Sequence, residues 1–231
     1  MVNELRHPDA AALTEALAIR VAAVLGEACL ERGGASLVVS GGRSPAAFLG
    51  RLSREPIPWG QTWVTLADER WVDPEGPESN QALVRRTLLQ GPAARARFVP
   101  LKNGAATAQL GEPACEALLR NVPRPFDLVV LGMGEDGHTA SLFPGAPQLG
   151  AALERGSNRL CIAVDPPAAP HARISLTLSA LLSSRRILLQ ISGARKWEVY
   201  QLARQPGSER ECPIRAIVQQ REVPVDVHWS P

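Results

Sequence analysis

Asp136 and His138 flank Gly137 and form the pair in this sequence with the clearest capacity for chemistry. They lie in LGMGEDGHTASLFPG, residues 131–145, which follows an apolar run. A histidine can exchange a proton near neutral pH, and a neighbouring carboxylate can orient its ring and stabilise its charged form. Because a glycine turn needs neither side chain, the spacing favours a general base over a structural histidine. Metal binding is the rival interpretation, but no second His or Cys lies nearby in the sequence to support it.

The stretch SGGRSP, residues 40–45, has the composition of an anion-binding turn. Its glycines, Gly41 and Gly42, allow close backbone approach, and the helix expected after it offers free N–H groups. Ser44 adds a hydroxyl and Arg43 a charge. The stretch is no Walker loop and lacks the third spaced glycine of a dinucleotide fingerprint. Phosphate binding and an ordinary tight turn are therefore equally supported here.

The stretch ADER places Asp68, Glu69 and Arg70 at the end of an apolar run. One interpretation is a solvated salt bridge on a loop. The other is an arginine that faces a substrate oxyanion and is held by neighbouring carboxylates. In the second case Asn80, downstream, would close over the same site.

Two more cations occur later in the chain, Arg173 in HARIS and Lys196 in SGARK, and the second follows an apolar run. A loop salt bridge and a surface charge are the alternatives for them. Yet the chain holds only two lysines, Lys102 and Lys196, among many arginines. A lysine kept just after Ser-Gly suits a phosphate, which it meets as a compact point charge.

These clusters need a fold that brings them together, and the hydrophobic pattern predicts one. Helical periodicity covers residues 9–31, and helices are expected near 107–120, over 193–204, and from a cap at Ser79 to Gln90. Pro45 should be the first residue of another helix, and residues 69–80 should form a loop. Strands are expected at 36–40, 62–68, 126–132, 159–164 and 185–191, with 225–229 as a final edge strand. The alternation predicts one α/β domain over residues 1–231, with a doubly wound, mostly parallel, Rossmann-like sheet. Ligands of such sheets bind beyond the carboxyl ends of the strands, where the clusters lie.

Composition excludes several classes of protein. The 231 residues are 45% hydrophobic with a net charge of +2, which gives no push toward nucleic acid or membranes. Apolar runs are shorter than a bilayer span, and the N-terminus predicts no signal peptide. The four cysteines are far apart, which argues against a zinc site or disulfide framework and fits a reducing cytoplasm.

GMGEDGHTASLFP and DERWV…SN resemble the signatures of the 6-phosphogluconolactonase family, and the likeness runs from Gly41 to Lys196. The superfamily also holds glucosamine-6-phosphate deaminases, which are similar in the Gly-Gly loop and in Asp-Gly-His. Their motif continues Ile-Ala-Phe-Asn-Glu-Pro, so their glutamate aligns with Phe143, which cannot assist proton movement. That position favours the lactonase. Arg43 and Ser179 depart from the family pattern, which often has a hydroxyl residue and a proline there.

The resemblance implies hydrolysis of 6-phosphogluconolactone without cofactor or metal. His138, oriented by Asp136 or another carboxylate, would activate water, and Arg70, positioned by Asp68, would stabilise the oxyanion. The phosphate would dock at Gly41, Gly42, Ser44 and Lys196. Further expected substrate contacts are Arg43, Asn80, Gly132, Gly134, Thr139 and Arg173.

The expected partner is the small-molecule substrate, not nucleic acid or membrane, and the expected form is a cytoplasmic monomer or weak homodimer. A deaminase/isomerase is one alternative. Another is a sugar-phosphate sensor, but related sensors usually carry a DNA-binding helix-turn-helix, and a first core helix near residue 9 leaves no room for one.

Overall fold

The computed structural model describes residues 2–231, except for the side chains of Arg43 and Ser44. Its strands are β1 (Val2–Arg6), β2 (Ala35–Val39), β3 (Thr62–Leu66), β4 (Asp68–Arg70), β5 (Arg97–Val99), β6 (Leu128–Leu131), β7 (Cys161–Val164), β8 (Arg173–Leu176), β9 (Ile187–Ser192) and β10 (Val225–Ser230). Its α-helices are α1 (Ala10–Arg32), α2 (Arg43–Leu52), α3 (Asn80–Thr87), α4 (Ala108–Leu119), α5 (Leu149–Ala152), α6 (Leu178–Leu182), α7 (Ala194–Ala203) and α8 (Arg215–Val218).

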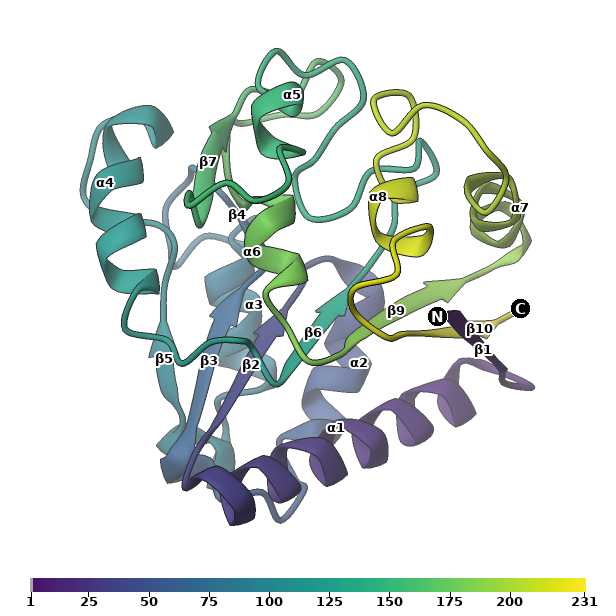
Figure 1. Ribbon diagram of the computed structural model, residues 1–231. Helices are drawn as coiled ribbons and strands as arrows, with labels where there is room; N and C mark the ends of the chain where they lie inside the picture. Colours follow the sequence, from purple (N-terminus) through teal and green to yellow (C-terminus); the bar gives the residue numbers. More distant parts are fainter. Residues whose placement is uncertain (1) are drawn as a thin grey trace.

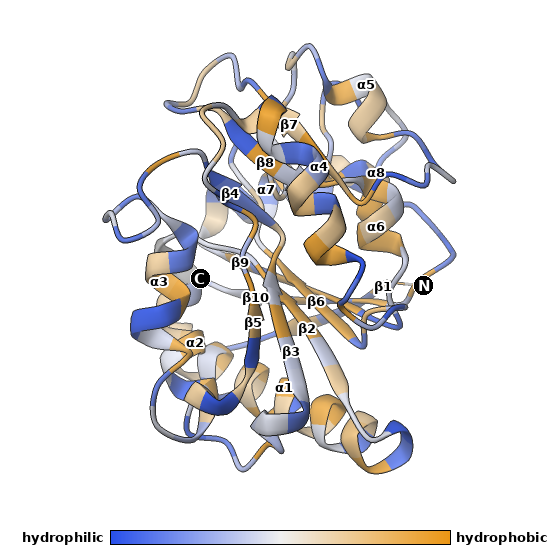
Figure 2. Ribbon diagram, turned by 90° about the vertical axis from the view of Figure 1, so that its left-hand side faces the viewer, coloured by the Kyte–Doolittle hydropathy of each residue, from blue (hydrophilic) through white to orange (hydrophobic). Residues whose placement is uncertain are grey.

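A parallel sheet forms the centre of the molecule (Figure 1). Within the described residues it has seven strands in the order β1-β10-β9-β6-β2-β3-β5. The central strands β2 and β6 are buried along their whole length, as expected for parallel strands covered on both faces. Figure 2 shows α1, α2 and α3 on one side of this sheet and α4, α6 and α8 on the other. The predicted α/β class is therefore confirmed.

Local signals account for where the helices begin and end. Asp9 caps α1 by accepting a hydrogen bond from the Ala12 N–H at 2.8 Å, and Gly33 ends it in the left-handed region at φ 71°. Ser79 caps α3 as predicted, but that helix ends at Thr87 rather than Gln90. Pro45 is the third residue of α2, not the first.

A small antiparallel sheet, β4-β8-β7, was not predicted and corrects two expectations. Residues 62–68 are not one strand, and residues 69–80 are not wholly a loop, because Asp68–Arg70 form β4 in this second sheet. The chain leaves the main sheet at Ala67, whose N–H donates to Val39 and whose carbonyl accepts from Leu176. The register then sets Arg70 opposite Arg173. Residues far apart in the sequence thus bring two guanidinium groups together.

The edge of the main sheet also differs from the prediction. β10 is an interior strand, paired with both β1 and β9, because the N-terminal β1 covers its outer side. β1, β5 and β8 were missed because their three to five residues include charged side chains, whereas the short β2, β6 and β7 stand out as largely apolar runs. Between residues 2 and 231 no helix is long and apolar enough to cross a membrane.

The pairing of β1 with β10 buries His228 beneath His7. The two rings stack with centroids 5.2 Å apart, and His7 Nε2 lies 3.1 Å from His228 Nδ1. Among the described residues the buried His228 Nε2 has no hydrogen-bond partner. Burial lowers the pKa of His228 to about 4, and the neighbouring His7 acts in the same direction.

This buried histidine should make the fold less stable in mild acid. The folded-state pKa lies below the ordinary value of 6.5, so the unfolded chain takes up a proton first as the pH falls. The contribution of His228 to the free energy of unfolding is therefore fully present above about pH 6.5. It is lost progressively toward pH 4, by up to about 3 kcal/mol. Urea unfolding at pH 7 and 4.5 should show a smaller loss for His228→Gln than for the wild type. Equal losses would contradict this.

Candidate active site

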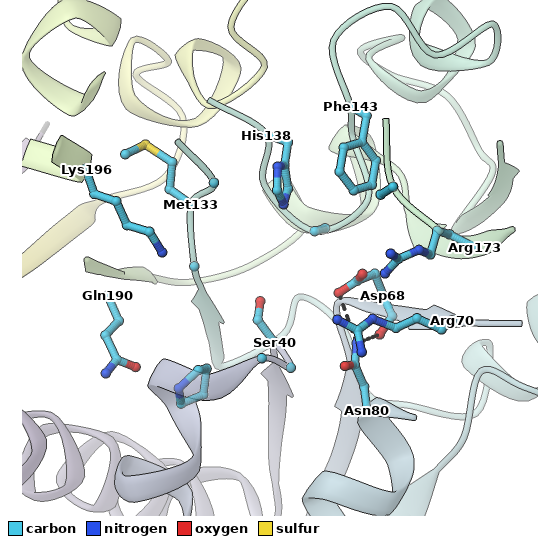
Figure 3. A pocket seen from close by; sticks show the side chains of 17 residues that line it. Ser40, Asp68, Arg70, Asn80, Met133, His138, Phe143, Arg173, Gln190 and Lys196 are labelled. Atoms are coloured by element: carbon cyan, nitrogen blue, oxygen red, sulfur yellow. Dashed lines mark hydrogen bonds between the residues drawn. The ribbon is translucent and has the colours of Figure 1, made fainter. Parts of the chain in front are cut away.

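A cavity of about 290 Å³ lies at the carboxyl edge of the parallel strands. Figure 3 shows side chains from both sheets facing it. Each stretch singled out in the sequence contributes to its lining. Most of them follow parallel strands that end at this edge, whereas Arg70 and Arg173 come from the antiparallel sheet. The predicted residues that line it are Gly41, Gly42, Asp68, Arg70, Asn80, Gly132, Gly134, His138, Arg173 and Lys196.

His138 is held by Asp136 at the cavity wall. His138 Nδ1 lies 2.5 Å from Asp136 Oδ1, and the His138 N–H donates to the same oxygen at 3.1 Å. Burial alone would raise the pKa of Asp136, but the hydrogen bond and charge of His138 outweigh it and hold this pKa below its ordinary value. Asp136 is therefore the acceptor and Nδ1 carries the hydrogen. Nε2 is left as the lone pair that can take a proton.

The turn around His138 depends on its glycines. The Gly134 N–H donates to the His138 carbonyl at 2.9 Å, and a Cβ at Gly134 would lie 2.2 Å from His138 Nδ1. Gly137 has φ 78°, in the left-handed region that favours glycine. Thr139 does not line the cavity; its buried hydroxyl donates to the Gly132 carbonyl at 2.8 Å and ties the turn to the end of β6.

Phe143 packs on the imidazole. The two ring centroids are 4.3 Å apart with an interplanar angle of 32°. The Arg173 guanidinium carbon lies 5.7 Å from the centroid of the same aromatic ring. The position where related deaminases are expected to carry a glutamate thus offers an apolar face and no proton.

Arg70 and Arg173 line one wall together. Arg70 donates to the Glu78 carbonyl, and Arg173 Nη2 donates to the Pro170 carbonyl at 3.1 Å. Burial lowers the pKa of Arg173, while the nearby Asp68 carboxylate opposes this shift. Two guanidinium groups beside one cavity-facing carboxylate leave this wall positive, which suits an anionic ligand or an oxyanion.

Asp68 has other partners than the one predicted. Its Oδ2 accepts from the Ser141 hydroxyl at 2.6 Å, and Asn80 Nδ2 donates to its backbone carbonyl at 2.8 Å. The Arg70 guanidinium donates to the Glu78 carbonyl instead, so Asp68 does not position Arg70 by a direct bond in the described structure. Ser141 was missed, although it stands three residues after His138 in the same motif.

Glu69 anchors the start of α3 beside the cavity. This fully buried carboxylate accepts from the backbone N–H groups of Arg70, Asn80 and Gln81 at 2.7–2.8 Å and from the Ser79 hydroxyl at 3.0 Å. Burial raises its pKa, and these hydrogen bonds oppose the shift. The solvated salt bridge considered for this cluster is therefore wrong for Glu69. The sequence offers one signal for this role of Glu69, which is that it is an acidic residue upstream of the helix that Ser79 was predicted to cap.

Asn80, which Glu69 holds, lies directly against the Gly-Gly turn. A Cβ at Gly41 would fall 1.8 Å from Asn80 Oδ1, so the close approach requires glycine. The predicted contacts of the Arg43 and Ser44 side chains lie outside the described residues. The α2 backbone nevertheless begins at the cavity, after Gly42 at φ 104°.

Lys196 faces the cavity from the opposite side to the arginines (Figure 3). Sequence reasoning missed several neighbours, because amide, thioether and small apolar side chains carry no strong chemical signal. In the part of the chain described, no three His, Cys, Asp or Glu residues are grouped as metal ligands would be. The lining residues that the sequence analysis did not single out are Ser40, Pro45, Met133, Ala140, Ala169 and Gln190.

Comparison with known proteins places the chain in a family. The family model described as glucosamine-6-phosphate isomerases/6-phosphogluconolactonase matches residues 8–229. A 6-phosphogluconolactonase of Pseudomonas aeruginosa is 44% identical, with 100% of this chain and 99% of that protein covered. One from Rhizobium meliloti is also 44% identical, covering 95% of each. The crystal structure of a 6-phosphogluconolactonase from Shewanella baltica has a TM-score of 0.98 at 45% identity, covering 100% of this chain and 98% of that one. This chain therefore belongs to the glucosamine-6-phosphate isomerase/6-phosphogluconolactonase family.

Proposed function

We propose that this protein is a 6-phosphogluconolactonase, which hydrolyses 6-phospho-D-glucono-1,5-lactone to 6-phosphogluconate. The observation that carries the proposal is the His138–Asp136 pair packed against Phe143 in one cavity. The pair supplies a base, and Phe143 supplies no second acid of the kind that ring opening of an amino sugar would use. The curated relatives that bear the lactonase name support the same assignment.

The first step needs a base and a water molecule. His138 Nε2 takes a proton from water, and the resulting hydroxide attacks the lactone carbonyl carbon. Asp136 keeps Nδ1 protonated, holds the ring in place and stabilises the imidazolium that forms. The tetrahedral intermediate then carries a negative charge on the former carbonyl oxygen.

The second step needs stabilisation of that oxyanion and a returned proton. Arg70 faces the cavity and serves as the cationic donor to the oxyanion. His138 gives its proton to the ring oxygen as the carbon–oxygen bond breaks, which yields the open-chain acid. Asn80 and Asp68 shape the wall beside Arg70.

The phosphate requires cations away from the reacting carbon. Lys196 lies opposite the arginine wall, in a cavity that Gly41, Gly42 and the first turn of α2 also line. A helix start presents free N–H groups, which suit a phosphate. Arg173, on the wall opposite Lys196, is a further candidate for a substrate contact.

Lys196→Ala should raise KM for the lactone at least several-fold and leave kcat little changed, because it removes binding shared by ground and transition states. The only other lysine of the chain, Lys102, makes a matched control, since it bonds to the Asn103 carbonyl and lies over the Trp71 ring outside the cavity. Initial rates at varied substrate concentration measure both variants. An unchanged KM for Lys196→Ala would move phosphate recognition elsewhere.

A coupled assay on fresh 6-phosphogluconolactone, with the spontaneous rate subtracted, tests the proposed function itself. We expect hydrolysis well above that rate, without an added metal or cofactor. Incubation with glucosamine 6-phosphate and an ammonia assay tests the deaminase alternative. Ammonia release without lactone hydrolysis would reverse the assignment.

A further inference from the structure

The end of strand β10 lies beside Gly193, the residue that precedes the helix carrying Lys196. β10 lies beside β9, with Trp229 opposite Ile191 and Ser230 opposite Ser192. Figure 1 shows β9 leading into α7 directly beside the end of β10. Gly193 joins β9 to α7, and Lys196 follows in the first turn of that helix.

Both peptide groups of Gly193 are held by the last residues of β10. The Gly193 N–H donates to the Ser230 carbonyl at 2.9 Å, and the Trp229 indole N–H donates to the Gly193 carbonyl at 3.2 Å. That carbonyl also accepts a hydrogen bond from the Trp197 N–H at 3.2 Å, which is the first backbone hydrogen bond of α7. Gly193 has φ 88° and α7 has no side-chain cap, so the two bonds from β10 fix the residue that precedes the helix.

A cluster of aromatic rings also connects β10 to the start of α7. The Trp229 and Trp197 rings have centroids 5.0 Å apart, and the Arg6 guanidinium carbon lies 4.8 Å from the Trp197 centroid. Trp197 is the residue after Lys196, and its ring also lies 5.1 Å from that of Tyr200. These tilted ring contacts therefore join β1, β10 and the first turn of α7, which carries Lys196.

We infer that Trp229 is a positioning residue for substrate phosphate: it fixes the Gly193 loop and thereby the direction from which Lys196 enters the cavity. The inference rests on the proposed function, because it assigns Lys196 to the phosphate. Trp229 itself is not among the residues that line the cavity, so it acts through the loop. Loss of its N–H should weaken binding of the phosphorylated substrate and spare the reacting end.

Trp229→Phe tests this, since phenylalanine keeps an aromatic ring and removes the donor. KM should rise about two- to tenfold with kcat unchanged, the range that one neutral hydrogen bond supports. The matched control is Trp59→Phe, which loses an indole bond of the same 3.2 Å length to the Glu55 carbonyl, away from the cavity. Its KM should not change.

A double variant separates positioning from a general structural effect. In a Lys196→Ala background, Trp229→Phe should raise KM no further, because the group it positions is gone. Gly193→Ala is a second route to the same loop: its added Cβ meets no atom within 4 Å, so it disturbs only the φ of 88°. It too should raise KM.

Each failure can be told from the others. Unchanged KM in folded Trp229→Phe and Gly193→Ala, or a rise that adds fully to that of Lys196→Ala, would overturn the positioning role. A wild-type rate equal to spontaneous hydrolysis would instead defeat the proposed function. Calorimetric affinity for 6-phosphogluconate would then decide the positioning role without turnover, by the same comparison of variants.

Discussion

His138→Asn should lower kcat for lactone hydrolysis by about 10²–10⁴-fold, the usual contribution of general acid–base catalysis. Asparagine cannot take the proton from water or return it to the ring oxygen. KM should change little, because the phosphate end of the cavity is intact. The thermal midpoint should stay close to that of the wild type, since His138 lies at the cavity surface rather than in the core.

His171→Asn is the matched control for this variant. His171 also pairs with a carboxylate, with Nε2 2.9 Å from Glu78 Oε2, but it does not line the cavity. It adopts φ 67°, a conformation that asparagine tolerates better than most residues. Its kcat should match the wild type. Near-normal turnover in folded His138→Asn would reject His138 as the base.

Arg70→Met should lower kcat by about 10²–10³-fold, the usual effect of removing one oxyanion donor. The reason is that charge on the lactone oxygen appears only after attack, so a donor to it acts mainly in the transition state. Methionine keeps much of the aliphatic length of arginine and removes the guanidinium. Single-turnover rates on fresh lactone separate this step from substrate binding.

Arg173→Met is the matched comparison for Arg70→Met, because it separates an oxyanion donor from a substrate-binding cation. The two arginines face each other across β4 and β8, so both variants remove a cation from the same wall. We expect Arg173→Met to act mainly on KM, as a substrate contact already made in the ground state would. The opposite pattern, with kcat lost in Arg173→Met and KM raised in Arg70→Met, would exchange the two roles.

Asp136–His138 and the Gly-Gly turn were recognisable from the sequence because local spacing sets their geometry. A residue two positions from a histidine is within reach whatever the rest of the fold does, and a glycine pair after an apolar run signals a turn. The α/β class followed from periodicity over whole strands and helices. Phe143 was identified by its place in the motif, and its contact with His138 agrees with that choice.

Other features depend on contacts between distant segments. Three of them join residues at least 36 positions apart in the sequence. They are the register pairing of Arg70 with Arg173, the hydrogen bond from Ser141 to Asp68, and the hydrogen bond from Trp229 to Gly193. The predicted Asp68–Arg70 pairing failed for this reason. Asp68 and Arg70 lie two positions apart and share one face of β4, but Asp68 accepts from the Ser141 hydroxyl and Arg70 donates to the Glu78 carbonyl.

The sequence by itself thus determined the Asp136–His138 pair, the Gly-Gly turn and the family resemblance, because these follow from residue type and near neighbours. Only the tertiary structure decided which side chains meet across the cavity and which hold them in place. That depends on strand order and register. After β3 the chain leaves the main sheet and β4 pairs with β8 in a second sheet, and β1 pairs with the outer side of β10. Such pairings are set by packing over the whole chain, so no short stretch encodes them.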